Sequence, residues 1–375
     1  MMAAVFWISV AGVAYPYFGF PLLLWCLGKI IKRPALTSDP GFAPSISLII
    51  PVHNEDSRIS RKLVNTRALD YPPERIQVLF VSDGSTDRTV EIIRANADAA
   101  FTLVELPRRG GKAAALNAGL ERATNDILVF SDASIELEPE SLRRLVAQFR
   151  DPKIGCVSGE DRISESGGEG TYGRYEVFLR RLESHVHSIV GASGSFYAQR
   201  RALCTPFTEG MAPDFLSVIR TVEQGYRAVT EPLAVGLMTS VTDTKHEFDR
   251  KVRTFIRGMT TLFAHPGVLN PLRSTVFAFT MWSHKVLRWT VPFFLVSSFI
   301  SAIALFDRPF YLAVLVAQVV FYLAALAAWA GWGGIHRSFP GKVSLYFSIV
   351  NAAILSAWFH YSSGVRQEIW TPSRR

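Results

Sequence analysis

The chain has 375 residues, of which 49% are hydrophobic and 12% aromatic, and its formal net charge is +8. This apolar content is high for a soluble protein, so part of the chain is expected to lie in lipid. The charge does not predict nucleic-acid binding, because Lys and Arg are scattered and no basic run carries interleaved aromatic residues. Anionic lipids and a phosphorylated substrate fit it better. The chain has three cysteines, an odd number without CxxC spacing: Cys26, Cys156 and Cys204. This pattern predicts structural thiols rather than disulfides or a zinc site.

Four apolar segments without Asp, Glu, Lys or Arg are long enough to cross a bilayer of roughly 30 Å. They cover residues 5–27, 289–306, 310–332 and 343–360. The alternative for residues 5–27 is a cleaved signal peptide. We favour a membrane span there, because the segment is long, lacks a basic n-region and has aromatic residues where a small-residue cleavage site is expected.

Basic residues predict the orientation, because the cytoplasmic flanks of membrane spans carry an excess of Lys and Arg. Lys29, Lys32 and Arg33 follow the first segment, and Lys285 and Arg288 precede the second. These positions predict a multi-pass protein of the cell inner (plasma) membrane whose central domain is cytoplasmic.

The C-terminal tail conflicts with this topology, because three later crossings would leave Arg366, Arg374 and Arg375 outside. Either one C-terminal segment is re-entrant or interfacial, or the charge rule does not hold there. The expected regions are an N-terminal transmembrane helix (1–33), a soluble α/β domain (45–240), interfacial amphipathic helices (241–285), C-terminal transmembrane helices (286–362) and a tail (363–375).

Between the membrane segments, apolar strands alternate with helical patterns, which is typical of a doubly wound α/β sheet. Strands are predicted over residues 45–52, 77–82, 101–105 and 127–131, and helices over 57–69, 86–95, 111–123 and 172–190. In such sheets ligands bind beyond the carboxyl ends of the strands, so the residues that follow each strand are the candidates for a site.

Acidic residues follow three of these strands. Glu55 comes after the first strand, Asp83 after the second and Asp132 after the fourth. Each has a structural explanation as a turn former or a helix cap. Three carboxylates at one edge would nevertheless repel one another unless a cation or donor groups compensate. A divalent metal ion together with a diphosphate would do so.

A glycine pair opens the helix predicted over residues 111–123. Gly110 and Gly111 precede Lys112, and free amides at a helix start beside an ammonium group favour phosphate oxygens. The segment is not a Walker A loop, because that motif requires Ser or Thr after the lysine and Ala113 stands there. The pattern therefore predicts an anion site and argues against an ATPase.

Four motifs, PVHNE (51–55), DGSTD (83–87), GGKAAALNAGLERA (110–123) and FSDAS (130–134), together resemble family 2 glycosyltransferases with a GT-A fold. The similarity covers about residues 45–260. With its membrane segments the whole chain resembles membrane-anchored bacterial exopolysaccharide transferases. The resemblance implies a Rossmann-like, doubly wound mixed sheet and an enzyme that transfers a hexosyl or N-acetylhexosaminyl group from a nucleotide-sugar.

The resemblance also implies a donor site at the strand ends. Pro51, His53 and Glu55 would lie around the uracil and ribose of a UDP-sugar, and Asp83 would contact the base. Lys112 would lie near the nucleotide.

Asp132 matches the first acid of the family's DxD motif, whose carboxylates hold Mg²⁺ or Mn²⁺ against the diphosphate. Ser134 stands in place of the second acid, and a hydroxyl is a weaker ligand than a carboxylate. Such a cation often keeps several waters and needs only one or two protein carboxylates. Glu136 is a nearby alternative ligand. The departure at Ser134 also leaves open a catalytically inactive membrane scaffold.

Asp214 falls where the family keeps its general base, at the start of a helix that ends near Gly225. The alternative role is an N-cap carboxylate. Pro213 precedes it where many relatives have a second acid, and the missing like charge should leave Asp214 easier to ionise.

Gly191, Ser193 and Gly194 resemble the family's acceptor-side loop. Arg257 is what remains of the QxxRW motif of processive relatives. It would neutralise the departing diphosphate or, as part of a basic interfacial helix, contact lipid headgroups. The missing Gln and Trp argue against a processive synthase.

We therefore predict an inverting single displacement from a nucleotide-sugar to a lipid-linked or growing saccharide acceptor in polysaccharide biosynthesis. A processive polysaccharide synthase coupled to export is the alternative enzyme. Membrane lipids are expected partners, nucleic acid is not, and a homo-oligomer is compatible with the sequence.

Overall fold

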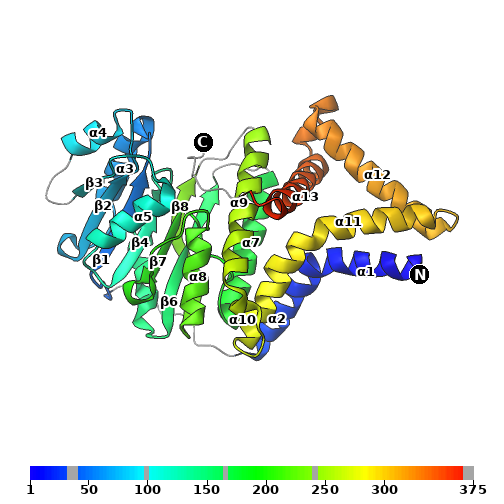
Figure 1. Cartoon of the computed structure of the whole chain (residues 1–375), viewed down its shortest axis with the longest axis horizontal. Helices are drawn as coiled ribbons and strands as arrows, with labels where there is room; N and C mark the ends of the chain where they lie inside the picture. The colour runs from blue at the N-terminus through cyan, green and yellow to red at the C-terminus, as the bar shows by residue number, and fades with distance from the viewer. Residues whose placement is uncertain (32–40, 97–100, 164–167, 239–243, 366–375) are drawn as a thin grey trace.

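The computed structural model describes residues 1–31, 41–96, 101–163, 168–238 and 244–365. A domain with one large sheet lies at one end of the molecule, and a set of long helices extends from its other side (Figure 1). The C-terminal residues Arg366, Arg374 and Arg375, on which the predicted topology conflict rests, lie outside the described residues.

One eight-stranded mixed sheet forms the core of the domain, with the strand order β3-β2-β1-β4-β7-β6-β8-β5. The strands are β1 (Ile46–Val52), β2 (Ile76–Ser82), β3 (Phe101–Glu105), β4 (Ile127–Ser131), β5 (Glu136–Leu137), β6 (Ile154–Ile163), β7 (Phe196–Arg200) and β8 (Arg227–Met238). Strands β1 to β4 are mutually parallel, whereas β7 is antiparallel to both β4 and β6. The doubly wound mixed sheet is confirmed.

The chain reverses its direction of winding between β1 and β4. It adds β2 and β3 on one side of β1 and then returns to place β4 on the other side. The pairing of β1 with β4 stops at Ile49 and Phe130, before either strand ends. A crevice outside the carboxyl ends of the strands is expected at such a switch point.

Helices cover both faces of the sheet, because alternate residues of each strand point to opposite sides. Ile49 packs in the core that includes α5 (Gly111–Arg122) and α8 (Pro213–Glu223), whereas Leu48 and Ile50 pack in the core that includes α3 (Asp56–Arg67), α4 (Thr89–Ala95) and α6 (Ser141–Ala147). Residues buried on both sides explain the uninterrupted apolar sequence of β1.

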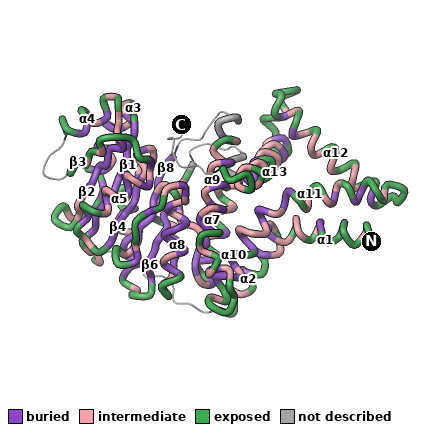
Figure 2. The backbone as a smooth tube through the Cα atoms, in the orientation of Figure 1, coloured by how far each residue is buried: buried purple, intermediate pink, exposed green. Residues whose placement is uncertain are grey.

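Four helical segments have the length and composition of membrane spans, as predicted. They are Met2–Ile30 (α1, a π turn and α2), Thr275–Ala304 (α10, a π turn and α11), Pro309–Trp329 (α12) and Phe339–Ser362 (α13). Much of the surface of α1 and α12 is exposed (Figure 2), and the large exposed side chains there are apolar, as lipid contact requires.

Two helices join the sheet domain to these spans. On α7 (Gly168–Val186), Tyr175 donates a hydrogen bond to the Tyr17 carbonyl at 2.9 Å, and His185 contacts the Gly28 carbonyl at 2.9 Å. On α9 (Thr244–Ala264), buried residues such as Ile256 share the core that contains Val350 of α13. The interfacial role and the boundaries expected for residues 241–285 stay predictions.

Candidate active site

The turns after β1 and β2 are held together by short side chains. Asn54 has a left-handed backbone (φ 52°), a conformation that asparagine tolerates better than most residues. Its side-chain oxygen accepts a hydrogen bond from the backbone amide of Thr86 at 2.8 Å, and its backbone amide donates a hydrogen bond to the Ser85 hydroxyl at 3.2 Å. His53 Nδ1 lies 2.7 Å from the Asp83 carbonyl. The two predicted donor motifs therefore form one rigid unit.

Asp83 is buried and acts as the anion at the start of α5. Its two carboxylate oxygens accept hydrogen bonds from the amides of Gly110 (2.7 Å) and Gly111 (2.9 Å). Gly111 needs its left-handed backbone there (φ 89°), and a Cβ would lie 2.8 Å from Glu209 Oε1. The amides expected to bind phosphate are thus occupied by a carboxylate, which corrects that part of the anion-site prediction.

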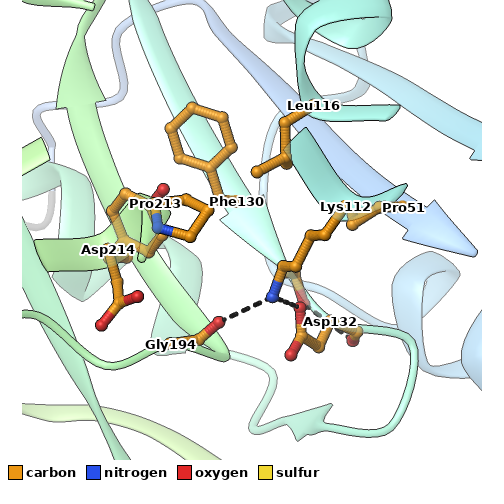
Figure 3. Close-up of a pocket in the computed structure, with 10 residues that line it drawn as sticks. Pro51, Lys112, Leu116, Phe130, Asp132, Gly194, Pro213 and Asp214 are labelled. Carbon is orange, nitrogen blue, oxygen red and sulfur yellow. Dashed lines mark hydrogen bonds and ion pairs between the residues drawn. The ribbon is translucent and has the colours of Figure 1, made fainter. Parts of the chain in front are cut away.

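Lys112 connects the turn at Asp132 to the loop at Gly194. Its ammonium group lies 2.5 Å from an oxygen of Asp132 and donates a second hydrogen bond to the Gly194 carbonyl at 3.1 Å (Figure 3). Pro51, Asp132, Gly194 and Asp214 all line the same small cavity at the switch point. The structure therefore brings together residues that are far apart in the sequence.

The side chains that could ligate a metal suit a divalent cation only when a substrate contributes further ligands. No group of three or more His, Cys, Asp or Glu side chains in the described part of the chain could hold a metal ion. Glu136 pairs with Arg61 at 2.5 Å and Asp132 pairs with Lys112 at 2.5 Å, while the Ser134 side chain is half-buried. One carboxylate is enough for a cation that also binds two phosphates and water, so these residues fit an ion that arrives with a diphosphate.

Asp214 lies across Gly194 from Lys112 (Figure 3). A Cβ on Gly194 would be 3.8 Å from Asp214 Cγ. The helix α8 has Ala212 as its N-cap and no side-chain cap, so the N-cap role is wrong. Burial raises the pKa of Asp214, and the nearby Lys112 opposes this. The absence of a second acid therefore does not make Asp214 easier to ionise than an ordinary aspartate. A raised pKa nevertheless suits a general base.

Comparisons with known proteins agree with this geometry. Residues 47–205 match the model of glycosyl transferase family 2. Residues 47–205 therefore belong to a glycosyl transferase family 2 domain. The poly-β-1,6-N-acetyl-D-glucosamine synthase of Staphylococcus aureus is 26% identical over 251 residues, which are 63% of this chain and 58% of the relative. The Staphylococcus epidermidis synthase is 32% identical over 158 residues, 38% of this chain and 37% of the relative. The chain thus spans less than two thirds of the length of these relatives.

A solved structure resembles almost the whole glycosyltransferase. It is the mannosyltransferase PcManGT from Pyrobaculum calidifontis in complex with GDP-mannose and Mn²⁺, with a TM-score of 0.76 and 26% identity. The similarity covers 96% of this chain and 99% of that chain. The GT-A fold expected for the catalytic domain is therefore confirmed, and the similar region includes the membrane helices.

Glu55 and the acceptor-side loop complete the predicted set of the glycosyltransferase. Burial raises the pKa of Glu55, which lies 3.4 Å from Arg58. Ser193 is buried, and its hydroxyl donates to Asp161 at 2.6 Å while it accepts from the Phe196 amide at 3.0 Å. Ser193 therefore fixes the loop, and Gly194 is the loop residue that lies against Asp214. The acceptor-side role of Gly191, Ser193 and Gly194 stays a prediction.

Arg257 reaches the site from α9. Its guanidinium nitrogen Nη2 lies 3.8 Å from Oε1 of Glu209. The carboxylate of Glu209 also lies against Gly111 at the start of α5. Burial lowers the pKa of Arg257, and Glu209 opposes this. The arginine is thus paired with a residue of the sheet domain, and its role toward a diphosphate or toward lipid headgroups stays a prediction.

Sequence reasoning missed Lys62, a buried lysine beneath the Asp132 turn. Its ammonium group donates to the Ser131 hydroxyl (2.8 Å) and the Ile135 carbonyl (2.7 Å), which lie on either side of Asp132. Burial lowers its pKa to about 7. The available signal was its place on the apolar face of α3, at helical spacing from Ile59.

Proposed function

We propose that this glycosyltransferase transfers one sugar, with inversion, from a nucleotide-sugar to a lipid-linked saccharide in polysaccharide biosynthesis. The observation that carries the proposal is the arrangement around Gly194. Lys112 and Asp132 lie on one side of this glycine, and the half-buried side chain of Asp214 lies on the other. The names of the curated relatives support polysaccharide biosynthesis, and the GDP-mannose bound to PcManGT supports a nucleotide-sugar donor.

In this mechanism Asp214 accepts the proton of the acceptor hydroxyl. The hydroxyl oxygen forms a bond to the anomeric carbon while the bond from that carbon to the diphosphate breaks, so the configuration inverts. Lys112 and Arg257 stabilise the charge that develops on the leaving nucleoside diphosphate. A Mg²⁺ or Mn²⁺ ion held by Asp132, with Ser134 nearby, would neutralise further negative charge when bound with the donor.

The location of the protein follows from its four candidate spans and its basic flanks. Lys29, at the end of the first span, supports a catalytic domain on the cytoplasmic side of the inner membrane, whereas Lys285 lies within the second span and does not count as a flank. A nucleotide-sugar would be available to the domain on that side.

A screen of UDP-, GDP- and dTDP-sugars tests the proposal with full-length protein in membranes. Release of nucleoside diphosphate is measured with and without Mn²⁺ and a lipid extract. We expect release from one sugar class, which requires both the cation and the extract. The absence of release from every donor would refute the proposal.

A processive synthase is the second candidate, because the Staphylococcus relatives are named as polymer synthases. Product length separates the two. A radiolabelled sugar should enter a lipid-extractable product that carries one added residue. A long, lipid-free polymer would establish the processive activity instead.

A further inference from the structure

A lysine from a membrane helix reaches the acceptor-side loop of the catalytic domain. Lys285 lies in the π turn Trp282–Val286, between α10 and α11, and such turns are frequent at functional sites. Its ammonium nitrogen is 5.5 Å from the centre of the Phe215 ring and 3.6 Å from the position of a Cβ on Gly191. It also contributes to the field at Asp214, where it opposes the effect of burial on the pKa. A span thus places a cation beside the proposed base.

Within the described part of the protein the charge of Lys285 is balanced at a distance, by the Phe215 ring and by the carboxylates of Glu176, Glu183 and Asp214. No hydrogen bond or ion pair joins its ammonium group to another described residue, although the side chain is half-buried. Its basic neighbours differ in this respect. Lys112 pairs with Asp132, and Arg288 pairs with Glu176. A half-buried ammonium without a hydrogen-bonding partner is costly, so an anion is expected to bind it when the site is occupied.

An apolar groove is lined by the same helical segment ten residues further along, at Leu295. The groove has a volume of about 720 Å³, within the roughly 300–1,000 Å³ of ligand pockets. Aliphatic and aromatic side chains of the spans form most of its wall, including Val13, Leu295, Val314, Ala317, Phe321 and Val350. Such a lining cannot hydrate a saccharide chain, but it suits a hydrocarbon chain.

The groove has a more polar end beside Arg288, which follows Lys285 by three residues. Tyr172 and Tyr175 line that end, and the guanidinium of Arg288 lies 5.6 Å and 5.3 Å from their ring centres. Leu295 lines the groove ten residues after Lys285, a rise of about 15 Å along a helix. One helix therefore connects the anion-binding lysine to the apolar groove.

We propose that Lys285 binds the phosphate of an acceptor whose saccharide is linked through phosphate to a long hydrocarbon chain, and that the groove holds this chain. The inference rests on the proposed function and names the acceptor class. The nucleophile is still the acceptor hydroxyl. The phosphate contact at Lys285 would place the saccharide between Gly191 and Asp214.

Binding of a lipid phosphate, measured without donor, tests this inference separately from catalysis. Full-length protein in phosphatidylcholine nanodiscs is titrated with undecaprenyl phosphate and with uncharged undecaprenol. Lys285→Gln should weaken binding of the phosphate about 10- to 100-fold, the effect of losing a hydrogen bond to a charged group. Lys285→Arg should restore most of it. Lys29→Gln is the matched control, because Lys29 is exposed at the end of another span.

The groove is tested with two tryptophan variants on α12. Ala317→Trp fills the groove and should weaken binding of both lipids, whereas Val316→Trp, on an exposed neighbour outside the groove lining, should not. Equal binding of the phosphate by Lys285→Gln and the unaltered protein would overturn the inference. Equal competition by phosphatidylglycerol would also overturn it, because the site would then bind any anionic membrane lipid. A protein that binds the lipid phosphate but releases no nucleoside diphosphate would refute only the proposed function.

Discussion

Replacing Asp214 with asparagine is the most direct test of the proposed base, because the change removes the charge and keeps the shape. A positioned general base contributes about 10²- to 10⁴-fold to the rate. The turnover number for transfer should fall by that factor, which is about 3–5 kcal/mol of barrier height. The KM for the donor should change little, because Lys112 and Asp132 lie on the other side of Gly194.

The same substitution should not destabilise the fold. The pKa of Asp214 is higher in the folded protein than its ordinary value, because the carboxyl group is buried. Between the two values the folded state holds more protons than the unfolded state, so stability falls as pH rises through them. At neutral pH asparagine removes this penalty, and the midpoint of thermal unfolding should be unchanged or higher.

The assay is transfer from the identified nucleotide-sugar, followed between pH 4 and 9. The rate of the unaltered enzyme should rise with pH through the raised pKa of Asp214, above the ordinary aspartate range. Asp126→Asn is the control, because Asp126 is exposed at the amino end of β4, away from the site. Full turnover by Asp214→Asn would refute the role of this residue as the base.

Three further substitutions test other parts of the site. Asp83→Ala leaves two amides at the start of α5 without their acceptor and should cost about 2–6 kcal/mol of unfolding free energy, measured by denaturation; an unchanged midpoint would contradict the capping role. Between pH 7 and 10.5 the unfolded chain holds one proton more than the folded protein at Lys62, so the free energy of unfolding should rise with pH by at most about 5 kcal/mol. Lys62→Met should abolish this rise. If thermal unfolding shows the same pH dependence in both proteins, Lys62 is not perturbed. Ser134→Asp supplies a second carboxylate and should lower the Mn²⁺ concentration for half-maximal activity about tenfold; no change would place the ion elsewhere.

The donor side of the site could be predicted from the sequence because it depends on local order. Apolar strands at regular spacing fix a parallel sheet, and residues that follow parallel strands must meet at one edge. Asp132 and Lys112 could therefore be assigned to one site without coordinates, and the structure joins them by an ion pair. The four spans could also be predicted, because each is a continuous apolar segment.

The roles of individual polar groups could not be predicted in this way. Asp83 accepts hydrogen bonds from the amides of Gly110 and Gly111, a role that its place after a strand did not indicate, and its contact with a base stays a prediction. Lys62 was not singled out from the sequence, and it supports the Asp132 turn from within the core. Which partner a polar group bonds to depends on differences of a few tenths of an ångström in donor–acceptor distance, which composition and spacing do not encode.

The sequence by itself thus indicated four of the eight strands, the four spans, the resemblance to a family and the candidates at the strand ends. Only the tertiary structure decided how the membrane helices meet the catalytic domain. Lys285 and Gly191 are far apart in the chain, and their proximity follows from the packing of a π turn against the acceptor-side loop. Local patterns specify elements and their exposed or buried faces. Contacts between distant elements arise only when those faces pack together.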